Sequence, residues 1–531
     1  MSKFKVYIPF IIGLAVAAGI FIGGNLDFGD TSDKLFTSNS KKDKLNRLID
    51  YIDYEYVEDV NTDSIVDVTV NGILDNLDPH SVYIPKEKMK RSAENMKGNF
   101  VGIGINFYTF KDTITVIKTV ENGPSAKAGI KGGDRILEAN GKSLLGETND
   151  SLVEILRGKR YSEVKLKVYR KGEPKLLTFN VTRDVVPIKS VDAAYMLTED
   201  LGYIKINRFA ESTYKEFKKA LKRLKKEGAN SLVLDLRENP GGFLEIAVNI
   251  VDEFLEDNKL IVYTKNKKGD IEKSYSTSKG DFETGELFVM IDENSASASE
   301  IIAGALQDND KGTIVGRRSY GKGLVQREMQ LGDGSAVRLT VSKYYTPTGR
   351  SIQRSYANGN TDYYDDYSYR MKSGELIDES KIEVADSLKF TTPKGKVVYG
   401  GGGIIPDVFV PLNRKMENET LSFLERKGFF NNFIFEEIEK DRNYYSSISR
   451  QDFFDNYLVE DNMIKDFEEY LKIKTRSNIV FVAYREEVKH YLKATIAEQL
   501  YGFGAYHKIL NKHDDMIDKV IQLHQKVEVE E

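Results

Sequence analysis

The stretch LFVMIDENSASASEIIAGALQDNDKGTIVG, residues 287–316, decides the fold class. Its opening run LFVMI is apolar throughout and predicts a buried strand, residues 297–307 predict a helix, and GTIVG predicts a second buried strand. Continuously apolar strands that alternate with helices are typical of a parallel sheet covered by helices. The stretch therefore predicts an α/β core.

The same alternation continues toward the N-terminus. The predicted elements there are strands at residues 201–209 and 231–236 and helices at 214–226 and 244–255. In parallel sheets, sites form beyond the carboxyl ends of the strands. The candidate site loops are therefore RENPGG, residues 237–242, and DENSAS, residues 292–297.

Composition divides the 531 residues into segments of different character. We predict a mixed, largely parallel-sheet core into which a compact, partly open β-barrel is inserted, with helical N- and C-terminal parts. Residues 355–392 are rich in Tyr, Asp and Ser and predict a surface insertion. The predicted boundaries are 1–26 for a signal anchor, 27–97 for a linker and N-terminal helices, 98–183 for the β-rich domain, 184–411 for the core and 412–531 for a helical accessory domain.

The N-terminus has the pattern of a membrane anchor. Lys3 and Lys5 precede an uncharged, mostly apolar run at residues 6–24. A helix rises about 1.5 Å per residue, so this run is just long enough to span a membrane. The lysines favour a cytoplasmic N-terminus and a single-pass anchor. A cleaved signal peptide, which would leave a soluble protein, is the alternative.

Charge and composition exclude several function classes. The net charge is −5 with both signs interspersed, which is not the basic footprint of a nucleic-acid binder. The chain has no cysteine, which excludes a thiol nucleophile, thiolate metal sites and disulfides. No histidine lies between residues 81 and 489, so a histidine-based triad cannot be built in the core. We expect no metal and no cofactor, and Ser with Lys remains as the route to an activated nucleophile.

Three serines of the SASAS run are candidate nucleophiles. Ser295, Ser297 and Ser299 lie between a predicted strand and a predicted helix. The N-terminus of a helix stabilises negative charge, which suits an oxygen that becomes anionic. Serine is also a favoured helix N-cap, so the residues alone leave both interpretations open.

Lys322 is the candidate base. It stands between Gly321 and Gly323, and in an extended chain Gln326 points to the same side. A lysine base must be neutral, and burial can lower its pKa from about 10.4 by disfavouring the charged form. An exposed lysine in a glycine turn is the alternative.

Gly241 and Gly242 end the RENPGG loop. Glycine lets backbone N–H groups approach a substrate closely, and such donors can hold a tetrahedral oxyanion. A simple tight turn is the alternative.

Taken together, these motifs resemble the C-terminal processing peptidases, also called tail-specific proteases. The resemblance covers roughly residues 45–411. Its motifs, in chain order, are LDPHS (77–81), GPSAKAGIKGGDRILEANG (123–141), LDLRENPGG (234–242), NSASASEIIAGALQD (294–308), GRRSYGKGLVQ (316–326), TPTGRSIQ (346–353) and GGGGIIPDVFVP (400–411).

The resemblance implies a role for each matching site residue. Ser297 becomes the nucleophile, Lys322 the general base, and Gln326 the residue that orients the lysine. The backbone N–H of Ala298, with Gly241 or Gly242, would form the oxyanion hole. Asp308 matches a position sometimes drawn as a third catalytic member, and we expect it to be structural because a helix length separates it from Ser297.

The resemblance also implies that residues 98–183 form a PDZ domain. Gly102, Ile103 and Gly104 would then bind the terminal carboxylate of a peptide whose tail pairs as an added strand. The implied protein is a serine endopeptidase of the bacterial cell envelope, anchored in the inner membrane with its body in the periplasm, or soluble there after signal cleavage. An inactive PDZ scaffold is the alternative. Expected partners are polypeptide C-termini, the membrane, and a second copy of the chain or an adaptor, but not nucleic acid.

Overall fold

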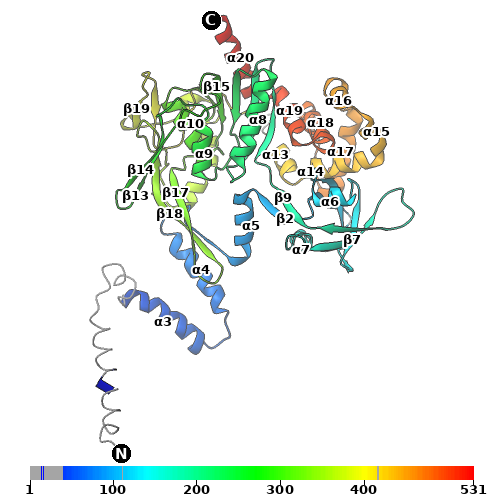
Figure 1. Cartoon of the computed structure of the whole chain (residues 1–531), viewed down its shortest axis with the longest axis horizontal. Helices are drawn as coiled ribbons and strands as arrows, with labels where there is room; N and C mark the ends of the chain where they lie inside the picture. The colour runs from blue at the N-terminus through cyan, green and yellow to red at the C-terminus, as the bar shows by residue number, and fades with distance from the viewer. Residues whose placement is uncertain (1–12, 15, 17–39, 111, 415–417, 531) are drawn as a thin grey trace, which may run out of the picture. The chain divides into compact units, whose positions relative to one another are not determined.

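The computed structural model describes residues 13, 14, 16, 40–110, 112–414 and 418–530 (Figure 1). The predicted anchor at residues 6–24 lies outside these ranges except at positions 13, 14 and 16. Within them, no helix combines the length and the apolar character that crossing a membrane requires. The chain divides into one compact unit up to Leu74 and a second from Asp75 onward.

The first unit contains helix α3 (Ser40–Glu55) and helix α4 (Thr62–Leu74). Asp63 lies in the first turn of α4. A carboxylate there interacts favourably with the helix dipole.

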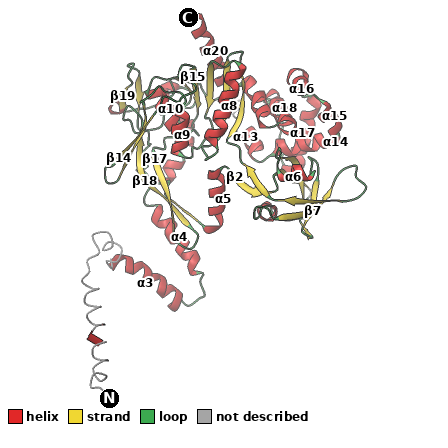
Figure 2. Ribbon diagram, viewed as in Figure 1, coloured by secondary structure: helices red, strands yellow, loops and turns green. Residues whose placement is uncertain are grey.

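A six-stranded sheet forms the centre of the second unit (Figure 2). All neighbouring pairs are parallel except the first, β10 with β11, which is antiparallel. This arrangement confirms the predicted mixed, largely parallel core. The strand order is β10 (Val191–Met196), β11 (Leu201–Ile206), β12 (Ser231–Asp235), β15 (Glu286–Ile291), β16 (Thr313–Gly316) and β21 (Val408–Phe409).

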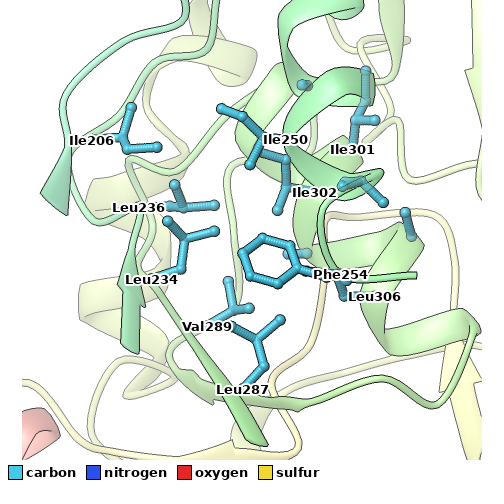
Figure 3. Packing of buried hydrophobic residues seen from close by; sticks show 14 of the residues in the cluster. Ile206, Leu234, Leu236, Ile250, Phe254, Leu287, Val289, Ile301, Ile302 and Leu306 are labelled. Atoms are coloured by element: carbon cyan, nitrogen blue, oxygen red, sulfur yellow. The ribbon is translucent and has the colours of Figure 1, made fainter. Parts of the chain in front are cut away.

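Three helices bury one face of this sheet: α8 (Thr213–Glu227), α9 (Leu244–Val251) and α10 (Ala298–Asp308). Their apolar side chains meet those of the strands in one cluster (Figure 3). Leu234, Phe254, Val289 and Ile302 are completely buried in it. Truncating such a side chain, as in Phe254→Ala, costs about 3–5 kcal/mol.

A second sheet holds the strand that follows Lys322. Its order is β1 (Val82–Ile84), β18 (Ala336–Tyr345), β13 (Leu260–Asn266) and β14 (Ile271–Tyr275), and β17 (Leu324–Gln330) also pairs with β18. The register of β17 against β18 shifts between Val325 and Gln326. A shift of this kind re-aims side chains, and here it lies at Gln326.

The β-rich domain has a sheet of its own. Its order is β3 (Ile105–Phe110), β4 (Thr113–Thr119), β5 (Arg135–Ala139), β7 (Glu163–Tyr169) and β8 (Leu177–Thr182), with β6 (Lys142–Ser143) beside β5. Helices α6 (Pro124–Ala128) and α7 (Asn149–Leu156) complete the domain, and β2 (Asn99–Gly102) pairs with β9 (Asp184–Pro187). β3 is an edge strand of the sheet. An unpaired edge can accept an added strand.

The C-terminal helices form a separate aromatic core, which includes Phe430, Phe433 and Phe467. This helical part contacts the β-rich domain: the Tyr108 and Phe435 rings lie 4.9 Å apart, and Lys118 Nζ lies 3.7 Å from Glu498. The helices are α13 (Glu419–Arg426), α14 (Phe429–Lys440), α15 (Arg442–Ser447), α16 (Arg450–Asn456), α17 (Asp461–Thr475), α18 (Arg485–Tyr501) and α19 (Phe503–Leu510).

The segment at residues 355–392 is exposed over most of its length, as its composition predicts, but it has helices and a strand of its own and a few buried side chains. It contains α11 (Asn360–Tyr364), α12 (Asp366–Ser373) and β19 (Lys389–Thr391), which pairs with β20 (Val397–Tyr399). Tyr363 and Arg370 are 3% and 1% exposed. Tyrosine and arginine have long apolar bodies, so a polar composition did not prevent burial here.

Helix α20 (Asp515–Glu530) covers the other face of the central sheet. Its buried His524 lies between two carboxylates of the sheet, 2.7 Å from Glu286 Oε2 and 3.0 Å from Asp200 Oδ2. Burial acts to lower the pKa of His524, but the bonds to Glu286 and Asp200 outweigh burial, and the pKa is raised. These two hydrogen bonds fasten the helix to the sheet, and they favour the charged form of His524.

We expect His524→Gln to weaken the pH dependence of stability. A raised histidine pKa contributes stability that is fully present below about pH 6.5 and is lost as pH rises through the folded value. Urea unfolding of wild type from pH 5.5 to 9 should show this loss, and the variant should show much less of it. His507→Gln is the contrasting variant, because burial lowers the pKa of His507 to about 3. A depressed histidine pKa removes stability as pH falls below about 6.5, so this substitution should change the acid end of the range and leave the loss at higher pH as in wild type. Equal slopes for wild type and His524→Gln would contradict the assignment.

Candidate active site

Ser297 stands at the turn between β15 and α10, in a backbone conformation that non-glycine residues rarely adopt. Its φ is 55° and its ψ is −110°. Such strain persists only where the surrounding structure enforces it, and it is concentrated at functional sites. The turn leaves Ser297 half-buried, whereas Ser295 and Ser299 are completely buried.

The two flanking serines are engaged in structural hydrogen bonds. Ser295 Oγ donates to Leu236 O at 2.9 Å and accepts from Asp292 N at 2.9 Å. Ser299 Oγ donates to Asn239 O at 2.9 Å. Both serines therefore tie the SASAS turn to the RENPGG loop, and Ser297 is the most accessible of the three.

Lys322 has the surroundings of a lysine with a depressed pKa. Burial lowers its pKa first, the positive charge of Arg338 adds to the effect, and Glu300 and Asp78 act in the opposite direction. Lys322 Nζ donates to Gln326 Oε1 at 3.1 Å, so the two residues meet as their spacing predicts. Between described residues, no hydrogen bond joins Lys322 Nζ to the Ser297 hydroxyl. Such catalytic bonds are often long in unliganded enzymes and shorten when substrate binds.

Glu300, which is absent from the predicted site, joins the two loops. Its Oε2 accepts hydrogen bonds from Ser297 N at 2.8 Å and Lys322 N at 2.9 Å. Its Oε1 accepts from Ser319 Oγ at 2.5 Å and Gly321 N at 2.7 Å. Burial raises the pKa of Glu300, and these four donors counteract the rise. The sequence signal was present, because Ser297 and Glu300 have the spacing of a capping box.

Tyr344 makes a second connection between the same loops. Its buried hydroxyl lies 3.1 Å from Ser297 O and 2.8 Å from Lys322 O. Glu300 thus holds the backbone N–H groups of Ser297 and Lys322, and Tyr344 holds their backbone C=O groups. Nothing in the spacing of Tyr344 distinguishes it from the other aromatic residues of β18, so this role cannot be predicted from the sequence.

The RENPGG loop lies against Ser297. A Cβ added at Gly241, whose φ is +103°, would meet Ser297 Cβ at 2.8 Å. The Gly241 N–H donates to Asn239 Oδ1 at 2.9 Å and is therefore engaged. In the described parts of the chain, the N–H groups of Gly242 and Ala298 donate no hydrogen bond. Ala298 begins α10, where N–H groups have no partner within the helix.

A buried ion-pair network holds Arg237, the first residue of the RENPGG loop. Arg237 donates to Asp235 Oδ1 from its backbone N at 2.9 Å and from Nε at 3.0 Å. Arg237 also pairs with Asp514, just before α20, at 2.6 Å. Burial acts to raise the pKa of Asp235, but Arg237 and Lys205 outweigh it and hold the pKa far below its usual range.

Asp308 lies at the far end of α10 and does not contact Ser297. Its Oδ1 lies 2.7 Å from Arg350 Nη2, and both side chains are completely buried. Its Oδ2 accepts from Thr348 N at 3.0 Å and Oγ1 at 2.7 Å. These contacts are those of a structural residue.

The predicted carboxylate-binding residues lie where β2 leads into β3. Gly104 has a φ of +70°, and Ile103 is 2% exposed. The carbonyls of Ile103 and Gly104 accept from Ser125 N at 2.9 Å and Val120 N at 3.0 Å, which fixes the loop beside the edge strand β3. An edge strand of this kind can pair with an added peptide strand.

Comparison with known proteins assigns families to three segments. Residues 200–361 match peptidase family S41, residues 101–181 match the PDZ domain, and residues 420–502 match a family of unknown function, DUF8443. The chain is 35% identical over 347 residues to the carboxy-terminal-processing protease of Bartonella bacilliformis, which covers 63% of this chain and 79% of that protein. It is 33% identical over 350 residues to the carboxy-terminal processing protease CtpB of Bacillus subtilis, covering 64% and 73%.

Among solved structures, the chain is similar to a photosystem II D1 C-terminal processing protease, with 26% identity and a TM-score of 0.35. The match covers 69% of this chain and 86% of that one.

We expect Glu300→Gln to slow reaction of Ser297 with a fluorophosphonate about a hundredfold, because an amide nitrogen would face two N–H donors. Labelling rates followed by mass spectrometry measure this, and thermal unfolding checks that the variant folds. Glu293→Gln is the matched control, since Glu293 is a buried carboxylate of the same loop that pairs with Arg317. If Glu300→Gln is labelled as fast as wild type, Glu300 does not position the serine.

Proposed function

The chain belongs to peptidase family S41 and is a serine endopeptidase with a PDZ domain, and we propose that it cleaves by a Ser297/Lys322 acyl-enzyme mechanism. The observation that carries this proposal is the buried Glu300 carboxylate, which accepts the backbone N–H groups of both residues. It fixes the two loops against each other and leaves both side chains free to react.

In the acylation step, neutral Lys322 Nζ takes the proton of Ser297 Oγ as that oxygen attacks the carbonyl carbon of the scissile peptide bond. The carbonyl π electrons move to the oxygen, which becomes an oxyanion. When the oxyanion collapses, the C–N bond breaks and the Lys322 ammonium gives its proton to the leaving amine. An acyl ester on Ser297 remains.

Deacylation repeats this chemistry with water. Lys322, neutral again, takes a proton from the attacking water, whose oxygen adds to the ester carbon. The C–O bond to Ser297 then breaks and the lysine returns the proton to Ser297 Oγ. The products are a free carboxylate and regenerated enzyme, so one proton carrier serves both steps.

Gly242 and Ala298 are the proposed oxyanion donors. Their N–H groups make no hydrogen bond within the described chain, whereas that of Gly241 is donated to Asn239. Donors held in place before the charge develops stabilise it without further reorganisation. The N-terminus of α10 adds a favourable dipole at the same point.

The PDZ domain binds the C-termini of polypeptides, and we propose that these are the tails of the substrates. The loop at Gly102–Gly104 and the free edge of β3 support this mode of capture. Cleavage at Ser297 then acts on a chain already held by its tail. We further propose that the enzyme works in a bacterial cell envelope, with residues 6–24 as its anchor or as a cleaved signal.

We predict that Ser297→Ala lowers kcat/KM by at least about 10³-fold without unfolding the protein, because the nucleophile is lost. Cleavage of a tailed model substrate and fluorophosphonate labelling both report on it. Ser299→Ala is the control and should retain most activity. Cleavage by Ser297→Ala at the wild-type rate would overturn the assignment, and wild type that neither cleaves nor labels would indicate a PDZ scaffold.

We predict that the activity of wild type rises with pH through the depressed pKa of Lys322, because only the neutral amine accepts a proton. Lys322→Arg should be as inactive as Lys322→Ala at every pH, since arginine stays charged. Gln326→Ala should be milder because Gln326 only orients the amine. The measurement is kcat/KM from pH 6 to 10. Substantial activity of Lys322→Arg would mean that Lys322 supplies only positive charge.

A further inference from the structure

The LDPHS loop contacts Gln326, the residue that is hydrogen-bonded to the candidate base, through its backbone. Gln326 Nε2 donates to the carbonyl oxygen of His80, while Gln326 Oε1 accepts from Lys322 Nζ at 3.1 Å. A carbonyl can only accept, so the His80 carbonyl decides which end of the Gln326 amide faces the lysine. The carbonyl oxygen of Gln326 is thereby turned toward Lys322 and its NH₂ group away.

His80 is itself held by the insertion at residues 355–392. Its Nε2 lies 2.8 Å from the hydroxyl of Tyr363, and the two rings meet edge to face at 5.2 Å. Burial, and then the positive charge of Lys322, lower the pKa of His80 to about 4. Above that pH the ring is neutral, and among the described residues its Nε2 bonds to Tyr363, while the backbone N–H of His80 donates to Asp78 Oδ1 at 2.9 Å.

Tyr363 is fixed in turn by Gln353 and Arg354, and Gln353 also bonds the residue that follows Lys322. Gln353 Nε2 donates to the Tyr363 hydroxyl at 3.4 Å, and Gln353 Oε1 accepts from Gly323 N at 2.8 Å. The Arg354 guanidinium lies 4.0 Å from the ring centres of both Tyr320 and Tyr363. Because Gln353 donates, the Tyr363 proton is free for His80 Nε2.

We propose that Tyr363 is a positioning residue for the base: through His80 it holds the Gln326 amide so that its oxygen, and not its NH₂ group, faces Lys322. Tyr363 is 3% exposed and cannot contact substrate. The proposal rests on the Ser297/Lys322 mechanism. It gives the insertion a function in catalysis beyond covering the core.

Hydrogen-bond chemistry predicts what happens when the Gln326 amide is no longer held in this orientation. If the Gln326 amide rotates, its NH₂ group donates to the lone pair of neutral Lys322, the same lone pair that must take the serine proton. A donor facing the amine also favours its neutral form. The Lys322 amine then titrates at lower pH, but it takes the Ser297 proton more slowly. The other charges facing Lys322, those of Glu300, Asp78 and Arg338, are unchanged by this rotation.

The test is Tyr363→Phe, which removes the hydroxyl and keeps the ring. We expect kcat to fall about fivefold, the effect of one buried hydrogen bond, with KM unchanged and the acid limb of the pH profile moved to lower pH. Tyr364→Phe is the matched control: its hydroxyl bonds Pro79 O in the same loop but does not reach His80. It should leave both kcat and the acid limb as in wild type.

A double-mutant cycle separates this positioning role from a loss of stability. In a Gln326→Ala background, Tyr363→Phe should have no further effect, because the residue through which it acts is gone. Unchanged kcat in Tyr363→Phe, or an equal loss with and without Gln326, would overturn the inference. Activity of Lys322→Arg would instead overturn the mechanism on which it rests, so the two failures are distinguishable.

Discussion

The site depends on one buried negative charge. Glu300 is completely buried, and a carboxylate in such a place is stable only if hydrogen-bond donors replace the water that it has lost. Its donors come from two segments, the turn at Ser297 and the loop of Ser319, Gly321 and Lys322. The fold is therefore constrained to bring α10 and that loop together, and the proposed nucleophile and the proposed base arrive with them.

This constraint also allows a charged carboxylate to lie near a lysine that must be neutral. Burial disfavours both charged forms, which raises the pKa of Glu300 and lowers that of Lys322. A direct ion pair would reverse both shifts and leave a protonated lysine. Glu300 instead accepts the backbone N–H of Lys322, while the side-chain amine donates to the neutral amide of Gln326. The carboxylate fixes the main chain of the base without bonding to its amine.

Much of this arrangement is legible in the sequence. The apolar runs predict the central strands, because a strand buried on both faces admits few polar residues. The absence of histidine from the core makes Lys322 the candidate base. The predicted pairing of Lys322 with Gln326 is present in the structure. Glu300 was missed because a glutamate in a first helical turn is usually a surface residue. The composition of the insertion predicts its surface position, but it does not show that the body of Tyr363 is buried while its hydroxyl bonds His80.

The network beneath the RENPGG loop shows why the site depends on the end of the chain. Arg237 bonds Asp235, at the end of the completely buried strand β12, and also Asp514, just before α20. An arginine held by two carboxylates cannot lose one without leaving buried charge unbalanced. The loop that follows Arg237 places Gly241 against Ser297 and ends at Gly242, whose N–H is the proposed oxyanion donor. The seating of α20 on the sheet, through His524 and its apolar residues, is therefore part of what holds the proposed oxyanion donors in place.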